Sequence, residues 1–169
     1  MSGCEQLGGL PESVHESDYR AERFALLTGN HCCYQCKATT RVSAVGLAAY
    51  QERDREYGDY ALVADAVLLT GITALNEAAA GEVARLAPWM RLAHSKTAGL
   101  SYLANHCEHC GSMIGAWFIK KPDEAFFPTT PEDTERLSVV WIDKAIEAED
   151  EGGSSAMWLD RLLTGAAGP

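Results

Sequence analysis

Two pairs of cysteines carry the clearest metal-binding chemistry in this sequence. Cys33 and Cys36 lie in "HCCYQC", and Cys107 and Cys110 lie in "HCEHCG". Two cysteines at a CxxC spacing can reach one metal from a single turn, called a knuckle below, and four thiolates complete a tetrahedral shell. A closed shell of four sulfurs is typical of a structural zinc site. We therefore predict a structural Zn²⁺ bound by these four cysteines.

Other ligand sets stay open at this point. Cys32 could replace Cys33, although the two-residue gap between Cys33 and Cys36 matches that of the second pair. Three histidines flank the knuckles and could also contribute, namely His31, His106 and His109. We expect them to point away, as an imidazole beside a ligating cysteine usually does. An iron–sulfur cluster on the same four cysteines is a further alternative.

Catalytic motifs are not found around these residues. A thioredoxin-like CxxC stands before a helix, whose N-terminus lowers the thiol pKa, whereas "CYQC" is followed by a strand pattern. A zinc deaminase needs a PCxxC downstream of its HxE, and none follows His106 and Glu108. HExxH, P-loop, GxGxxG and GxSxG motifs are also missing from the sequence. We expect no catalytic residues and a protein that is not an enzyme, with an unrecognised active site as an alternative.

Predicted β-hairpins position both knuckles. "RFALLTGN" leads into the first knuckle and "TTRVSAVGLAAY", with its β-branched residues, leads out of it. "WMRLAHS" and "LSYLANHC" form a second predicted hairpin that feeds the other knuckle, and "GSMIGAWFIKK" is expected to leave it as a strand. Gly111 follows Cys110, where a small residue lets backbone N–H groups reach the sulfurs. Lys37 stands at the matching place after Cys36 and weakens the pattern there.

Two helices and two further strands complete the expected elements. A helix is predicted over 76–87, with Asn76 as its N-cap and Pro88 marking its end. A second helix is predicted over 156–163. Strands are expected over 66–72 and 136–142, and the four tryptophans are expected in the core.

These elements predict an α+β fold, in which antiparallel β-hairpins form a zinc-ribbon-like core with an inserted helix and a C-terminal helix. At 169 residues and 47% hydrophobic content the chain suits one domain. We expect a disordered N-terminal tail over 1–20 and a single zinc-ribbon-like domain over 21–169, with an insertion at about 47–100 and an acidic C-terminal part over 122–169. No apolar run approaches the roughly 20 residues that span a bilayer, and the first 20 residues are polar, so we expect a cytoplasmic protein.

Negative charge is concentrated near the end of the chain. The net charge is −10, and residues 122–160 hold eleven Asp or Glu against Arg136 and Lys144, which leaves nine of the ten net negative charges there. A surface of this kind repels a phosphate backbone. It either keeps the protein soluble or serves as a docking surface for a basic protein partner.

Nucleic-acid binding is the competing hypothesis, although the net charge disfavours it. Such a site needs clustered Lys and Arg with aromatic residues between them. Residues 1–121 are close to neutral, and the sequence does not show whether their candidate basic residues share a face. These candidates are Arg41, Arg53, Arg55, Arg85, Arg91, Lys96, Lys120 and Lys121.

"TGNHCCYQC" with "SYLANHCEHCGSMIG" resembles an uncharacterised group of bacterial zinc-ribbon-like proteins with paired CxxC knuckles. The resemblance covers residues 26–128, and "GAWF" keeps the aromatics of the group's segment after the second knuckle but not its acidic residue. It implies a zinc-bound fold and no particular reaction. We expect a zinc-stabilised protein-binding module acting through its acidic surface, in a toxin-neutralising, anti-defence or regulatory role.

Overall fold

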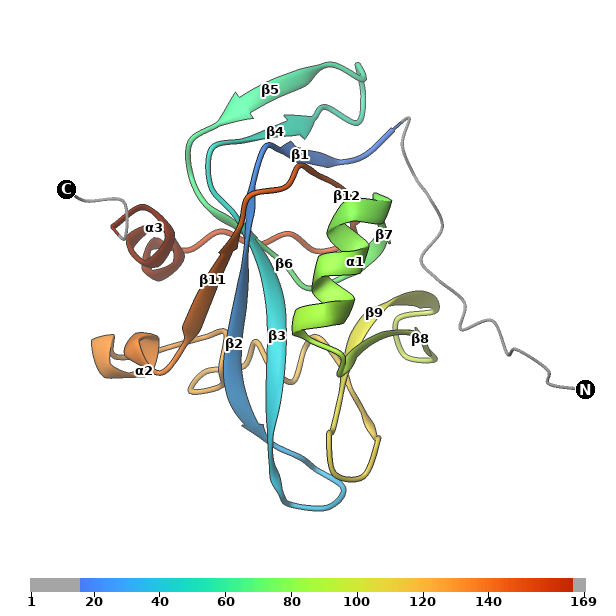
Figure 1. Ribbon diagram of the computed structural model, residues 1–169, viewed down its shortest axis with the longest axis vertical. Coiled ribbons are helices and arrows are strands. Elements are labelled where there is room, and N and C mark those ends of the chain that lie inside the picture. The colour runs from blue at the N-terminus through green and yellow to red at the C-terminus, as the bar shows by residue number, and fades with distance from the viewer. Residues whose placement is uncertain (1–15, 166–169) are drawn as a thin grey trace, which may run out of the picture.

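The computed structural model describes residues 16–165 as a mixed α+β fold of mostly antiparallel strands (Figure 1). The strands in this range are β1 (Tyr19–Ala21), β2 (Phe24–Cys32), β3 (Thr39–Leu47), β4 (Tyr50–Arg53), β5 (Tyr60–Val63), β6 (Val67–Leu69), β7 (Ile72–Leu75), β8 (Met90–Ser95), β9 (Leu100–His106), β10 (Met113–Ile114), β11 (Ser138–Ile142) and β12 (Ile146–Asp150). The helices are α1 (Glu77–Leu86), α2 (Pro131–Glu135) and α3 (Met157–Thr164). The predicted α+β class is confirmed.

A long hairpin of β2 and β3 carries the first knuckle at its tip. The two strands pair from Ala25 with Gly46 down to Cys32 with Thr39. β11 pairs with β2, and β6 pairs with β3, so that the sheet has the order β11-β2-β3-β6. The predicted hairpin is therefore confirmed, and Cys33 and Cys36 lie in the loop that connects its two strands.

A second hairpin, β8–β9, carries the second knuckle, and β10 pairs with the end of β9. The strand predicted after this knuckle is wrong in its length, because only Met113–Ile114 are extended. Beyond them, Phe118 N donates to Gly115 O, and Ala116 N donates to the Tyr102 hydroxyl. Local turns and the Tyr102 hydroxyl thus satisfy backbone N–H groups that would otherwise form hydrogen bonds to a neighbouring strand.

The third sheet has the order β5-β4-β1-β12-β7, with β1 at its centre. Tyr19 and Arg20 pair with β4 on one side and with β12 on the other, and Tyr19 is buried in the core. The disordered tail predicted over 1–20 is therefore too long at its end, since these two residues are held by strands on both sides. Residues 1–15 of that tail lie outside the described residues.

The segment predicted as an insertion, 47–100, pairs with strands from outside its own range. β6 adds to the edge of β3, and β7 adds to the edge of β12. The single strand predicted over 66–72 is divided between β6 and β7, with a turn at Thr70 and Gly71. This turn is held by the buried Asp150, whose Oδ1 accepts a hydrogen bond of 2.8 Å from Gly71 N.

Both predicted helices are present within about one residue of their expected bounds. In α1, Ala79 and Val83 face the core as the sequence pattern indicates. Asn76 precedes α1, but its side chain does not cap the helix: Oδ1 accepts from Glu147 N at 2.9 Å, and Nδ2 donates to Ala145 O at 3.1 Å. α2 was not predicted, although the capping box of Thr130 and Asp133 marks its start.

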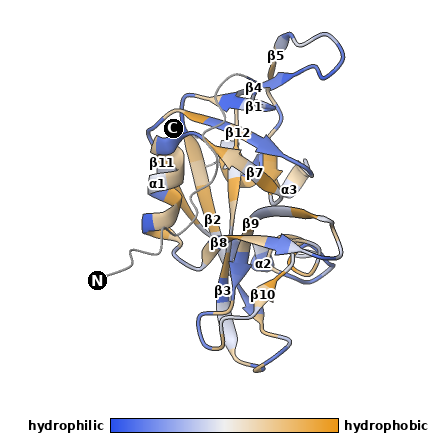
Figure 2. Cartoon of the chain, turned by 90° about the vertical axis from the view of Figure 1, so that its right-hand side faces the viewer, coloured by the Kyte–Doolittle hydropathy of each residue, from blue (hydrophilic) through white to orange (hydrophobic). Residues whose placement is uncertain are grey.

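The buried apolar side chains form two clusters inside the sheets, and Figure 2 shows hydrophobic residues along the strands in the middle of the molecule. One cluster packs α1 against the five-stranded sheet. The other packs Leu159 and Leu163 of α3 together with Cys33 and Cys107. Within residues 16–165, no helix has the length and apolar character needed to cross a membrane.

Candidate metal centre

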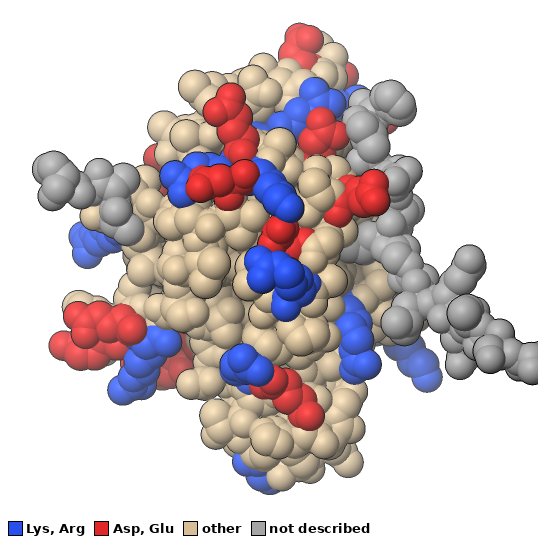
Figure 3. All heavy atoms as spheres, in the orientation of Figure 1, with Lys and Arg blue, Asp and Glu red and all other residues tan. Residues whose placement is uncertain are grey.

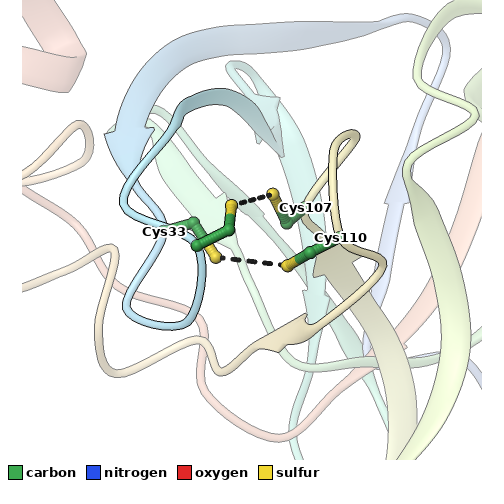
Figure 4. A group of neighbouring side chains, drawn as sticks. Cys33, Cys107 and Cys110 are labelled. Atoms are coloured by element: carbon green, nitrogen blue, oxygen red, sulfur yellow. Dashed lines mark hydrogen bonds between the residues drawn. The ribbon is translucent and has the colours of Figure 1, made fainter.

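The two knuckles face each other at one end of the molecule (Figure 4). The first follows β2, and its two cysteines are Cys33 and Cys36; the second follows β9, and its two cysteines are Cys107 and Cys110. In Figure 4 the thiols of the two loops point toward one another. The structure thus brings all four sequence-predicted ligands into one group, although more than 70 residues separate the pairs along the chain.

Both knuckles have the same backbone hydrogen bonds. In each, the amide of the first cysteine donates five residues ahead, and its carbonyl accepts from the residue that follows the second cysteine. The four bonds are Cys33 N–Ala38 O, Lys37 N–Cys33 O, Cys107 N–Ser112 O and Gly111 N–Cys107 O, each 2.9 Å long. Two otherwise dissimilar sequences therefore form the same turn.

The residue after the second cysteine has a left-handed backbone in both knuckles. Gly111 has φ +75° and Lys37 has φ +62°. Glycine adopts this conformation without steric cost, whereas a lysine does not. The Lys37 side chain folds back, and its Nζ donates to Tyr34 O at 2.7 Å. Lys37 therefore does not prevent the turn that its presence was expected to weaken.

The sulfur positions fit a single tetrahedral ion. Sγ of Cys33 lies 3.7 Å from Sγ of Cys110, and Sγ of Cys36 lies 3.7 Å from Sγ of Cys107. All four sulfurs lie within 4.8 Å of one another. A tetrahedron with metal–sulfur bonds of about 2.3 Å has edges of about 3.8 Å. The four cysteines are free thiols, not disulfides, and each of the two short separations links one knuckle to the other.

One sulfur of each knuckle is buried and the other is exposed. Cys33 and Cys107 are 0% and 3% exposed, and both pack in the apolar cluster beside α3. Cys36 and Cys110 lie at the surface. An ion held between them would therefore be anchored to the core on one side and be near solvent on the other.

Hydrogen bonds change the acidity of these thiols in opposite directions. The hydrogen bond between Cys110 Sγ and Ser112 Oγ, together with the Ser112 amide, lowers the pKa of Cys110 to about 6. The backbone amide of Cys110 lowers the pKa of Cys107. At Cys36 the amide of Ala38 favours the thiolate, but desolvation and the neighbouring sulfurs outweigh it and raise the pKa to about 11. In the metal-free protein, negative charge would therefore gather first on the second knuckle.

Side chains around the cluster tie the second knuckle to β3. The Arg41 guanidinium binds the Glu108 carboxylate through two bonds of 3.1 and 2.5 Å, and it lies 4.1 Å from the ring centre of Trp89. This pairing lowers the pKa of Glu108. The Glu108 amide also donates to Thr40 Oγ1 at 3.0 Å. The sequence pattern did not single out Ser112, Arg41 or Glu108 as supporting residues, because only the folded hairpins bring them together.

The alternative ligands lie outside the sulfur group. Sγ of Cys32 is 3.6 Å from Lys37 O, and His31 Nδ1 is 2.7 Å from a carboxylate oxygen of Glu124. The other two histidines contact backbone carbonyls: His106 Nδ1 that of Ala104, and His109 Nε2 that of Thr39, both at 3.0 Å. Burial, followed by the charge of Arg91, lowers the pKa of His106. The group of potential metal ligands found in the described residues consists of the four cysteines.

Comparison with protein-family models, with curated proteins and with solved structures found no match to this chain. The class of protein that the fold and the site define is thus an α+β protein with a four-cysteine cluster able to hold a metal ion.

Proposed function

We propose that this protein is a non-enzymatic, zinc-stabilised protein-binding module with a zinc-ribbon-like core. The observation that carries the proposal is the closed group of four sulfurs, which supplies every position of a tetrahedral shell. Soft thiolate ligands favour zinc or iron–sulfur clusters. We favour zinc because separations of 3.7 Å suit one central ion, whereas a cluster of several irons places its own sulfides between the cysteines.

A structural role for the metal follows from the same geometry. A catalytic zinc keeps one position open for water or substrate, and here the protein would fill all four. The histidines in the described range are also engaged elsewhere. Their partners are Glu124 for His31, Ser101 for His94, Ala104 O for His106 and Thr39 O for His109.

The acidic segment, residues 122–160, has fewer carboxylates available to a partner than its composition indicates. Most of its carboxylates have partners inside the molecule, and basic and acidic side chains alternate over the face seen in Figure 3. These pairings are Asp123–Thr129, Glu124–His31, Asp133–Arg136, Asp143–Arg23, Glu147–Arg20, Asp150–Gly71 and Asp160–Ala66. The proposed docking surface therefore narrows to the part of the segment where acids border an apolar groove.

This groove lies between α2 and α3 and has a volume of about 580 Å³. Pro131, Met157 and Trp158 contribute to its lining, and Met157 is 74% exposed. Glu135 lies in the lining as well, close in sequence to Glu132 on the exposed surface of α2. Arg161 also lines the groove, so a protein segment would bind mainly through apolar anchors, with a Lys or Arg placed beside Glu135.

Affinity capture with the zinc-loaded chain tests this function. We expect a protein from the source cell to be retained by the wild type and by Tyr57→Ala, which changes an exposed aromatic residue outside the groove. Met157→Asp should lose that protein, because a charge would replace an apolar anchor. Calorimetry with the purified partner should then show weakening by Glu135→Gln. A capture experiment without an enriched protein, or equal loss in Met157→Asp and Tyr57→Ala, would contradict the proposal.

A further inference from the structure

A second groove lies between the β8–β9 turn and the segment that follows β10. It has a volume of about 530 Å³ and shares no lining residue with the groove between α2 and α3. Ser95, Thr97 and Ala98 line it from the β8–β9 turn, and Trp117 and Phe118 line it from the other segment. Its size lies in the range of ligand-binding sites.

The aromatic side chains of this groove are exposed, against the expectation that every tryptophan serves the core. Trp117 is 67% exposed and Phe118 is 44% exposed, whereas Trp89 is 6% exposed. The Trp117 and Phe118 rings meet edge to face, with centroids 5.3 Å apart. Two large rings at the surface, held at a fixed mutual angle, offer a flat partner a surface on which to stack.

Lys120 and Lys121 lie beside these rings. Lys121 Nζ lies 4.3 Å from the centre of the Trp117 ring and 4.6 Å from that of Phe118. Lys120 lines the groove, and Lys96 stands between two residues that line it. Glu151 is the one acidic residue in the lining. Lys120 and Lys121 thus outnumber the one acidic residue of the lining, although the charge of Lys120 also acts on the buried Asp150.

The other candidate basic residues of the sequence are neutralised or lie elsewhere. Four of them form ion pairs with carboxylates, namely Arg41 with Glu108, Arg53 with Glu16, Arg55 with Asp18 and Arg85 with Glu82. Among the described residues, no ion pair joins a carboxylate to Lys96, Lys120 or Lys121. The basic residues without such a pair thus include Lys120 and Lys121, which lie beside the exposed rings.

We propose that this groove binds single-stranded nucleic acid, with a base stacked on Trp117 and backbone phosphates beside Lys120 and Lys121. Exposed rings accept any base, because every base has a π face, and nearby lysines attract the phosphates. A duplex hides its base faces within its own stack and therefore suits the groove less well. The proposal goes beyond protein binding and concerns a different surface.

Fluorescence anisotropy of a labelled oligothymidylate of about 12 nucleotides tests the inference with the zinc-loaded full chain. We expect binding at about 50 mM salt that weakens as salt is added. Trp117→Ala should weaken binding by about tenfold or more, and Trp117→Phe should retain most of it. Tyr57→Ala is the matched control, because Tyr57 is an aromatic residue 74% exposed in the β4–β5 turn, and it should bind as the wild type does.

Lysine variants provide a second, independent readout. Lys120→Ala and Lys121→Ala should each reduce the slope of log affinity against log salt by about 0.7, whereas Lys144→Ala, whose Nζ pairs with Glu82, should leave it unchanged. An absence of binding at low salt would overturn the inference, as would equal losses in Trp117→Ala and Tyr57→Ala. Equally tight binding of a duplex, or of thymidine monophosphate alone, would overturn the commitment to a single strand.

Discussion

The residue after each CxxC pair determines how easily its knuckle forms. Both knuckles need a left-handed backbone there, and only the second has a glycine to supply it. The first uses Lys37, whose Cβ makes this conformation costly. The two knuckles thus form the same turn, but the residue after the second cysteine suits that turn in the second knuckle (Gly111) better than in the first (Lys37).

We expect Lys37→Gly to raise the free energy of unfolding by about 1 kcal/mol, because glycine removes the steric cost of the left-handed backbone. The reverse test is Gly111→Ala, which should lower it by a similar amount, since an added Cβ meets nothing within 4 Å and only the backbone cost is introduced. Urea unfolding in excess zinc measures both. Destabilisation by Lys37→Gly would contradict the turn geometry.

Ser112 should tune the zinc affinity through Cys110. Protons compete with zinc for a thiolate whenever the pH lies below the thiol pKa. Ser112 lowers the pKa of Cys110 to about 6, so that this group is a thiolate at neutral pH. Ser112→Ala removes the hydroxyl but keeps the backbone amide, so the pKa of Cys110 rises part of the way toward that of an ordinary thiol, and we expect zinc binding to weaken by up to about tenfold at pH 7.

The loss should shrink at about pH 9, near the ordinary thiol pKa, because protons then compete much less for Cys110 in either protein. Competition with a zinc chelator at the two pH values measures this difference. Ser138→Ala, at an exposed position on β11, is the control and should not change the affinity. Equal losses at both pH values would show that Ser112 acts on the site by some other route.

At the scale of the elements, α3 packs on the hairpin that carries the first knuckle. This contact depends on Gly46 of β3. A Cβ placed there would lie 2.7 Å from Leu27 Cδ1 and 2.9 Å from Leu163 Cδ1. Leu163 is buried in the same cluster as Cys33. The absence of a side chain at Gly46 therefore allows α3 to approach the sheet at the end of the hairpin away from the knuckle.

Gly46→Ala should lower the free energy of unfolding by about 1–3 kcal/mol through overpacking. Leu163→Ala alone should cost about 2–5 kcal/mol through the cavity it leaves. The double variant should be less destabilised than the sum of the two, because the new methyl group would partly fill that cavity. Thermal or urea unfolding of the wild type, the two single variants and the double variant measures these free energies.

Gly81→Ala is the control for these variants. Gly81 lies inside α1, and its added Cβ would meet nothing within 4 Å, so we expect the substitution to stabilise the protein by about 1 kcal/mol. Additive losses in the Gly46 and Leu163 double variant would show that the two residues do not share the packing described.

Local patterns predicted the elements better than their arrangement. The knuckles, the two hairpins that carry them and the helices near 76–87 and 156–163 follow from cysteine spacing, β-branched runs and helix signals. The short β10 could not be predicted, because the Tyr102 hydroxyl and local turns take up the backbone groups after it. β1 was missed because three residues carry little pattern, and their partners β4 and β12 lie far away along the chain.

The same limit applies to the candidate site. The four cysteines could be found because their spacing is local within each knuckle. Ser112 follows a knuckle closely, yet nothing about a serine there marks it as a partner for a sulfur. Arg41 and Glu108 come from different hairpins, and their contact exists only once the knuckles meet. Trp117 was expected in the core because its neighbours are apolar, a pattern that does not distinguish a buried strand from an exposed turn.

At the scale of the whole molecule, the four sulfurs join two hairpins that belong to separate sheets. One sheet contains β2 and β3, and the other contains β8, β9 and β10. Zinc binding releases on the order of 10–16 kcal/mol at structural sites, which is comparable to the whole stability of a domain. Metal removal should therefore separate the knuckle ends and lower the thermal midpoint strongly.

Chelation makes this expectation measurable. We expect a strong chelator to abolish the cooperative thermal transition or to shift it to much lower temperature, and zinc to restore it. Cys107→Ser combined with Cys110→Ser should unfold like the chelated wild type and should not respond to zinc. Cys32→Ser, which changes a thiol outside the sulfur group, should behave as the wild type does. A transition that is the same with and without chelator would show that the hairpins hold together without the ion.

The most direct test of the central claim is elemental analysis of the protein purified without added metal. We expect one zinc ion per chain, with no stoichiometric iron, and loss of that zinc in the Cys107→Ser and Cys110→Ser double variant. Purified protein without a stoichiometric metal, or a double variant that keeps its full zinc content, would contradict it.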